Sequence, residues 1–141
     1  MAEWKQVVVG VDGSEQSKRA LQWAGDEASK HGAELLIVST WATPLGGRLA
    51  APPEEVSNQL AQDTEAMLRR TLSETLGDSP QVPVNATVTR GYPAQVLVEL
   101  SDNADLLVVG SRGRGGFAGL LLGSVSQHVA TNARCTVVVV R

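Results

Sequence analysis

The chain has 141 residues, of which 43% are hydrophobic and 19% charged, and its formal net charge is −3. These values predict one globular domain spanning residues 1–141 and argue against a general nucleic-acid-binding protein, which would usually be basic. No apolar run reaches the ~18 residues of a membrane span, and the first residues lack a signal-peptide pattern. The single cysteine excludes an internal disulfide. We therefore expect a cytoplasmic protein with no membrane or nucleic acid as partner.

Nearly continuous valine and leucine runs alternate with helical patterns along the chain. Such runs are typical of parallel strands whose two faces are both covered by helices. In chain order, the predicted elements are a strand at 6–11, a helix at 14–31, a strand at 35–41, a helix at 54–76, a strand at 84–90, a helix at 93–100, a strand at 105–110, a helix starting at 124 and a strand at 135–140. This order predicts an α/β fold, a three-layer α/β/α sandwich around a five-stranded parallel sheet with right-handed crossovers.

Capping residues indicate where these helices begin and end. Gly32 suits the position just after the first helix, and Pro93 suits the first turn of the third. Ser14 and Ser124 are the expected N-caps of the first and fourth helices. One face of the second helix is expected to be apolar through Val56, Leu60, Met67, Leu68, Leu72 and Leu76.

Two of the predicted strands end in glycine followed by polar residues. The first continues as VVVGVDGSE and the fourth as VVGSRGRGG. Open parallel sheets bind ligands beyond the carboxyl ends of their strands, where the winding reverses. If these two strands are neighbours, Asp12 forms one wall of a site and the loop rich in glycine and arginine forms the other.

The loop after the fourth strand has the residue types that bind phosphate. Arg112 and Arg114 can add charge-assisted contacts, and Ser124 lies at a helix start, where free amides and the dipole favour an anion. The alternatives are a ligand-free turn, solvated arginines, and Asp12 as a turn or cap residue. Positive φ and close backbone approach are allowed at Gly110, Gly113, Gly115 and Gly116, so that backbone N–H groups can converge on an anion.

Familiar nucleotide motifs fit poorly. The chain has no G-x-x-x-x-G-K-[ST], which excludes a P-loop NTPase. Residues 113–118 match G-x-G-x-x-[GA], but they follow the fourth strand, and no Asp or Glu after Asp105 is present to hold a ribose. A phospho-receiver domain needs an aspartate at the end of the third strand, where this chain has Arg90 and Gly91.

The spacing of Gly110, Gly113, Gly123 and Ser124 matches G-x2-G-x9-G-[ST]. In this the chain resembles the ATP-binding members of the universal stress protein family. The resemblance covers the whole chain, including VDGSE after the first strand, RGYPA after the third and the C-terminal valine run. It departs at Thr136, where many relatives have proline.

The resemblance implies a Rossmann-like sheet of the adenine nucleotide alpha hydrolase-like type, with strand order 3-2-1-4-5. It also implies a homodimer through the C-terminal strand at 135–140, because a valine-rich edge needs covering. The implied ligand is ATP with Mg²⁺, with AMP or cAMP as alternatives.

The resemblance also implies roles for single residues. Asp12 would contact the nucleoside and is the candidate residue for a part in holding Mg²⁺, which the phosphates would otherwise bind. Thr40 would offer its backbone to adenine. The full set of expected nucleotide-binding residues is Gly10, Val11, Asp12, Thr40, Gly91, Gly110, Arg112, Gly113, Gly115, Gly123, Ser124 and Val125.

No residue pair in the sequence has the pattern of an activated nucleophile or a general base beside the glycine loop. Two isolated histidines and one cysteine form no zinc motif. We therefore expect no catalytic residues and a nucleotide-dependent regulator in stress response or dormancy, with at most slow ATP hydrolysis. An ATPase or nucleotidyl-transfer enzyme, or a cAMP-binding protein, remains the alternative.

Overall fold

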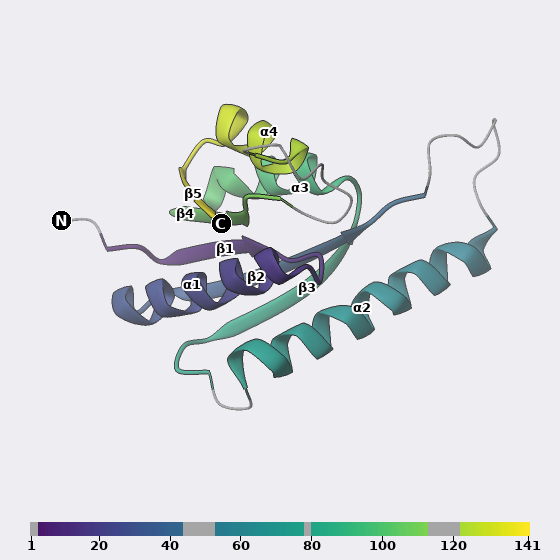
Figure 1. Ribbon diagram of the computed structural model, residues 1–141, viewed down its shortest axis with the longest axis horizontal. Coiled ribbons are helices and arrows are strands. Elements are labelled where there is room, and N and C mark those ends of the chain that lie inside the picture. The colour runs from purple at the N-terminus through teal and green to yellow at the C-terminus, as the bar shows by residue number, and fades with distance from the viewer. Residues whose placement is uncertain (1–2, 44–52, 78–79, 113–121) are drawn as a thin grey trace.

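A computed structural model describes residues 3–43, 53–77, 80–112 and 122–141, and it contains a five-stranded parallel sheet in the order β3-β2-β1-β4-β5 (Figure 1). This confirms the predicted fold class and strand order. In chain order the elements are β1 (Gln6–Gly10), α1 (Glu15–His31), β2 (Glu34–Trp41), α2 (Glu54–Leu76), β3 (Val84–Arg90), α3 (Pro93–Leu100), the short 3₁₀ helix η1 (Ser101–Asn103), β4 (Leu106–Gly110), α4 (Ser124–Asn132) and β5 (Thr136–Val140).

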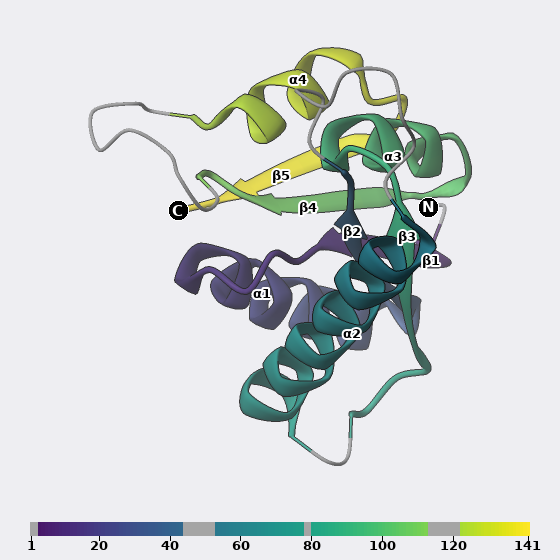
Figure 2. The same ribbon diagram turned by 90° about the vertical axis from the view of Figure 1, so that its right-hand side faces the viewer.

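The sheet is the middle of three layers. Helices α1 and α2 cover one face, and α3 and α4 cover the other (Figures 1 and 2). Side chains alternate across β1, so that Val7 and Val9 pack with α1 and α2 whereas Val8 packs with α3 and α4. All three valines are fully buried, which explains the apolar run at this point of the sequence.

The winding of the sheet reverses between β1 and β4. From β1 the chain proceeds outward through β2 to β3, then returns to the other side of β1 to form β4 and β5. Val9 is in register with Val108 of β4 and with Ile37 of β2. The loops that follow β1 and β4 therefore leave the sheet side by side, as ligand binding at a switch point requires.

The ends of α1 confirm the predicted caps, whereas the start of α4 does not. The Oγ of Ser14 accepts a hydrogen bond from the backbone N–H of Ser17 at 3.1 Å, and Gly32 ends the helix in the left-handed conformation with φ 63°. At α4 the N-cap is Gly123, and Ser124 is the first helical residue. The prediction of Ser124 as the cap was wrong, because the last extended residue before the helix is Gly123, with φ −77° and ψ 172°.

Helix α2 buries only the C-terminal part of its predicted apolar stripe. Met67, Leu68 and Leu72 pack against the core, but Val56 is 46% exposed. Figure 1 shows the first turns of α2 extending away from the sheet, so this part of the stripe does not pack on the sheet. Within the described residues, no helix has the length and apolar character needed to cross a membrane.

Candidate functional site

A cavity of about 350 Å³ opens at the carboxyl ends of β1 and β4. Of the predicted nucleotide-binding residues, Gly113 and Gly115 lie outside the described part of the chain. The structure brings all the others together around this cavity, although their contact with a ligand stays a prediction. They are Gly10, Val11, Asp12, Thr40, Gly91, Gly110, Arg112, Gly123, Ser124 and Val125.

The turn between β1 and α1 forms the wall that contains Asp12. Its Oδ1 accepts a hydrogen bond from the N–H of Ser14 at 2.9 Å, and its own N–H donates to the Oγ of Ser17 at 3.4 Å. Asp12 is therefore a turn residue, as one of the two interpretations expected. Because Asp12 also lines the cavity, the turn fixes a carboxylate at the edge of the site.

The end of β2 is tied to the end of β1. The N–H of Val11 donates to the carbonyl oxygen of Val38 at 2.9 Å, and the buried hydroxyl of Ser39 donates to the carbonyl oxygen of Val11 at 2.7 Å. These bonds continue the strand pairing beyond Gly10. They hold Val11 rigidly between Asp12 and the backbone of Thr40, the residue expected to face a base.

Gly91 forms the side of the cavity nearest β3. Its N–H donates to the carbonyl oxygen of Trp41 at 2.8 Å and its φ is 146°, a conformation that favours glycine. A Cβ at this position would lie 2.8 Å from Cγ2 of Val96. The backbone alone thus requires glycine here, whatever further role the residue has beside a ribose.

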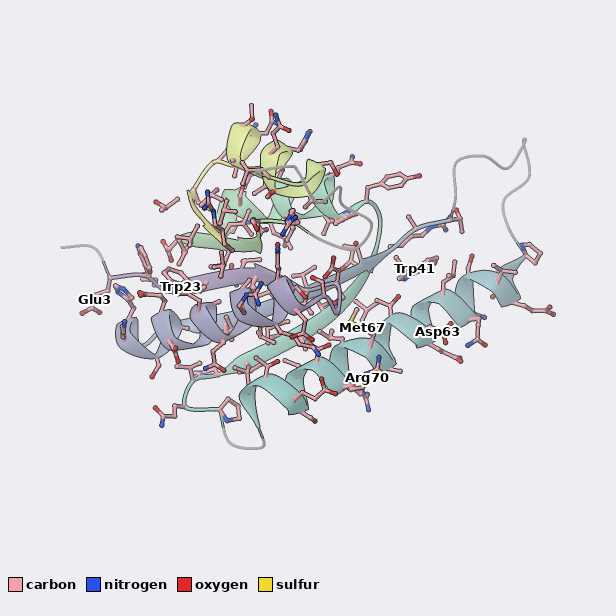
Figure 3. All side chains as sticks on the ribbon, in the orientation of Figure 1. Glu3, Trp23, Trp41, Asp63, Met67 and Arg70 are labelled. Carbon is pink, nitrogen blue, oxygen red and sulfur yellow. The ribbon has the colours of Figure 1, made fainter. Side chains whose placement is uncertain are left out.

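Trp41, the last residue of β2, also lines the cavity. The alternation of β2 places its side chain on the face shared by Ile37, the face that α1 and α2 cover. Figure 3 shows Trp41 at the end of β2 near α2. The guanidinium of Arg90 lies 5.5 Å from the centre of its ring, a cation–π contact that fixes the indole.

Gly110 does not use the positive φ that glycine allows, but it does provide close backbone approach. The described glycines with positive φ are Gly13, Gly32, Gly77 and Gly91, and Gly110 belongs to β4. A Cβ on Gly110 would lie 3.1–3.2 Å from the backbone and Cβ of Gln16 in α1. Glycine at 110 therefore permits the close approach of α1 to β4.

The far wall of the cavity is the start of α4. Gly123, Ser124 and Val125 line it together with Arg112. The first N–H groups of a helix have no intrahelical acceptor, and the helix dipole is positive at this end. Amides and an arginine therefore converge on one part of the cavity, an arrangement that suits an anionic group.

Titratable groups outside the cavity have structural roles. Two backbone N–H groups, of Gln6 and Lys5, hold the pKa of Asp105 below its usual value. Burial raises the pKa of the Cys135 thiol, which agrees with an inert cysteine. No group of three or more His, Cys, Asp or Glu side chains is placed to hold a metal in the described parts of the chain.

Sequence reasoning missed the polar residues beneath the cavity rim, namely Gln16, Ser111 and Ser126. Ser111 and Ser126 are 2% and 1% exposed, respectively, and hydrogen-bonded to each other. One signal was present in the sequence, because Ser126 lies one turn before Val129 on the inward face of α4. A serine on such a face needs a buried partner.

The family model for the universal stress protein family matches residues 3–141. Universal stress proteins Rv1996 and Rv2005c of Mycobacterium tuberculosis are 44% and 42% identical to the chain, each over 96% of its length. The chain spans less than half of these relatives, 43% and 45% of their respective lengths.

Solved structures show the same fold. UspA from Lactobacillus plantarum superposes with a TM-score of 0.82 at 21% identity, and the match covers both chains in full. A universal stress protein solved in complex with cAMP has a TM-score of 0.73 at 32% identity, over 99% of each chain. With the family match over nearly its whole length, the chain belongs to the universal stress protein family.

Proposed function

We propose that the chain binds an adenine nucleotide in the cavity between β1 and β4, and that ATP with Mg²⁺ is the preferred form. The observation that carries this proposal is the convergence of one carboxylate, one arginine and a helix N-terminus on a cavity at the switch point of the sheet. A volume of about 350 Å³ falls within the range of small-molecule sites.

The two ends of the cavity suit the two ends of a nucleotide. Leu97, Val38 and the backbone at Thr40 provide a mainly apolar region for a base. The α4 N-terminus and Arg112 provide amides and positive charge for phosphates. The nucleoside would lie between them, beside Asp12 and Gly91.

Mg²⁺ would arrive with the phosphates. It prefers oxygen ligands and keeps several waters, so one carboxylate and phosphate oxygens suffice to hold it. Asp12 is the carboxylate among the described residues that line the cavity. We propose that Asp12 holds the ion through water, and that bound Mg²⁺ supplies charge neutralisation to the phosphates.

A second candidate ligand is cAMP. It is favoured by the universal stress protein whose structure contains cAMP and which is 32% identical to this chain. A cyclic monophosphate carries one negative charge, so it needs fewer contacts with the N-terminus of α4 than a triphosphate does. Salt and Mg²⁺ dependence therefore distinguish the two ligands, because only ATP binding should strengthen with Mg²⁺.

We further propose that the chain, as a single domain over residues 1–141, acts as a nucleotide-dependent regulator in stress response or dormancy. Among the described residues lining the cavity, Asp12 is the acid available to activate a water, and the turn already engages it. Hydrolysis of ATP should therefore be slow. Sustained turnover at several per second by the pure protein would instead support the enzyme alternative.

Identification of the nucleotide retained by the purified protein tests the proposal. Denaturing the protein and analysing the released small molecules by mass spectrometry should yield ATP in near-stoichiometric amount. Recovery of cAMP would select the second candidate. If no adenine nucleotide is released, and none rebinds at millimolar concentration with Mg²⁺, the proposed function is wrong.

A further inference from the structure

Ser111, the residue that follows β4, is the centre of a buried hydrogen-bonded group. Its N–H donates to the carbonyl oxygen of Val140 at 2.7 Å. Its carbonyl oxygen accepts from the N–H of Gly123 at 2.6 Å and from the hydroxyl of Ser126 at 2.8 Å. The end of β4, the end of β5 and the start of α4 therefore meet at one residue.

Gln16 joins this group from α1. Its Oε1 accepts from the hydroxyl of Ser111 at 2.8 Å and from the N–H of Arg112 at 2.5 Å. A backbone N–H can only donate, so the oxygen of the Gln16 amide must face Arg112. We call Gln16, Ser111, Gly123 and Ser126 the Ser111 cluster.

The position of Gln16 depends on Gly110. A Cβ at residue 110 would crowd the backbone of Gln16, so glycine allows α1 to lie close enough for the side chain to reach Ser111 and Arg112. Gln16 is not among the residues that line the cavity, whereas Arg112, Gly123 and Ser126 are. It can act on a ligand only through these neighbours.

We propose that Gln16 is a positioning residue that holds Arg112 and the start of α4 in the geometry that receives the phosphates. That the group received here is a phosphate rests on the proposed nucleotide-binding function. The positioning itself rests on the two hydrogen bonds of Oε1 and on the burial of Ser111 and Ser126. Removing that oxygen would therefore break two hydrogen bonds at once, one to Ser111 and one to Arg112.

The first arm of the test uses the ligand-free protein. In Gln16→Met, which has a similar size and no acceptor oxygen, the amide of Arg112 should exchange with solvent about tenfold faster by NMR. The amides of Leu107 and Val109 in β4 serve as the internal reference and should not change. Gln16→Glu keeps an acceptor and should keep the protection of Arg112, whereas a purely steric role would predict unchanged protection in Gln16→Met as well.

The second arm measures affinity by calorimetry. Gln16→Met should weaken ATP binding about tenfold and change adenosine binding less than about twofold, because adenosine lacks phosphates. Gln22→Met is the matched control on α1, since Gln22 is exposed and its side chain donates a hydrogen bond to Asp26 on the same helix at 3.5 Å. It should leave both affinities unchanged.

Unchanged exchange of Arg112 in Gln16→Met, or an equal loss for ATP and adenosine, would overturn the inference. Failure of the unmodified protein to bind any adenine nucleotide would refute the proposed function instead. The hydrogen-exchange measurement on the ligand-free protein would still decide whether Gln16 holds Arg112 in place.

Discussion

Single residues in this protein often serve the backbone before they can serve a ligand. Asp12 accepts the N–H of Ser14, and Gly91 adopts a φ that other residues rarely tolerate. Gly110 makes room for α1. The motif that predicts a nucleotide site is therefore also a set of folding constraints, and substitutions at these positions would change stability and binding together. Residues that line the cavity without such duties are better probes of binding.

Asp105 offers a residue-scale prediction remote from the cavity. Its Oδ2 accepts from the N–H groups of Lys5 and Gln6 at 2.7 and 3.0 Å, which pins the start of β1 to β4. These bonds favour the carboxylate and lower its pKa in the folded state. A lowered folded pKa contributes stability above the unfolded pKa of about 3.9, and this stability is lost as the pH falls through the folded pKa.

We expect Asp105→Ala to lower the free energy of unfolding by about 1 kcal/mol at pH 7, since the carboxylate is only half-buried. The difference from the unmodified protein should shrink steadily below about pH 4. Urea denaturation at a series of pH values measures both. Asp102→Ala is the control, because Asp102 forms only an exposed ion pair with Arg134. If the loss in the free energy of unfolding caused by Asp105→Ala stays constant down to pH 2, the stabilising role of the Asp105 carboxylate is contradicted.

At the scale of elements, β5 is an edge strand, and no other described strand pairs with its outer side. The carbonyl oxygen of Val140 accepts from Ser111, so Val140 directs its polar backbone groups toward β4. Alternation along a parallel strand then directs those of Val139 outward. We propose that two copies of the chain pair through this outer side, because an exposed valine-rich edge favours association.

Val139→Pro should shift the protein from dimer to monomer in analytical ultracentrifugation. Proline removes the outward N–H without removing a bond to β4, and edge strands tolerate it. Val139→Thr keeps the N–H and a similar side-chain shape, so it should remain dimeric. Circular dichroism should show that both variants are folded. A proline variant that sediments like the unmodified protein would contradict pairing through β5.

At the scale of the whole molecule, the sequence predicts the fold because its signals agree with one another. Valine runs, Gly32 and Pro93 each mark a different feature of the same alternating architecture. The features that the sequence does not predict are contacts between elements that are far apart along the chain. No local pattern reveals that Gln16 reaches Ser111 over 95 residues of chain, or that Val56 lies beyond the sheet. These facts follow from how α1 and α2 dock, which is decided by packing in three dimensions.

We propose that the phosphates of the adenine nucleotide lie at the N-terminus of α4. Ser124 is exposed at the first position of this helix and lines the cavity. Asp at a helix start favours the dipole, so Ser124→Asp should fold at least as stably as the unmodified protein. Its charge would nonetheless repel phosphates by about 1–4 kcal/mol at close range.

The decisive measurement is a calorimetric titration of the unmodified protein, Ser124→Asp and the neutral control Ser124→Asn with ATP and with adenosine. The aspartate variant should lose at least about tenfold in ATP affinity. Its adenosine binding should be nearly unchanged, and the asparagine variant should resemble the unmodified protein. Equal ATP affinity in the unmodified protein and Ser124→Asp would contradict the claim.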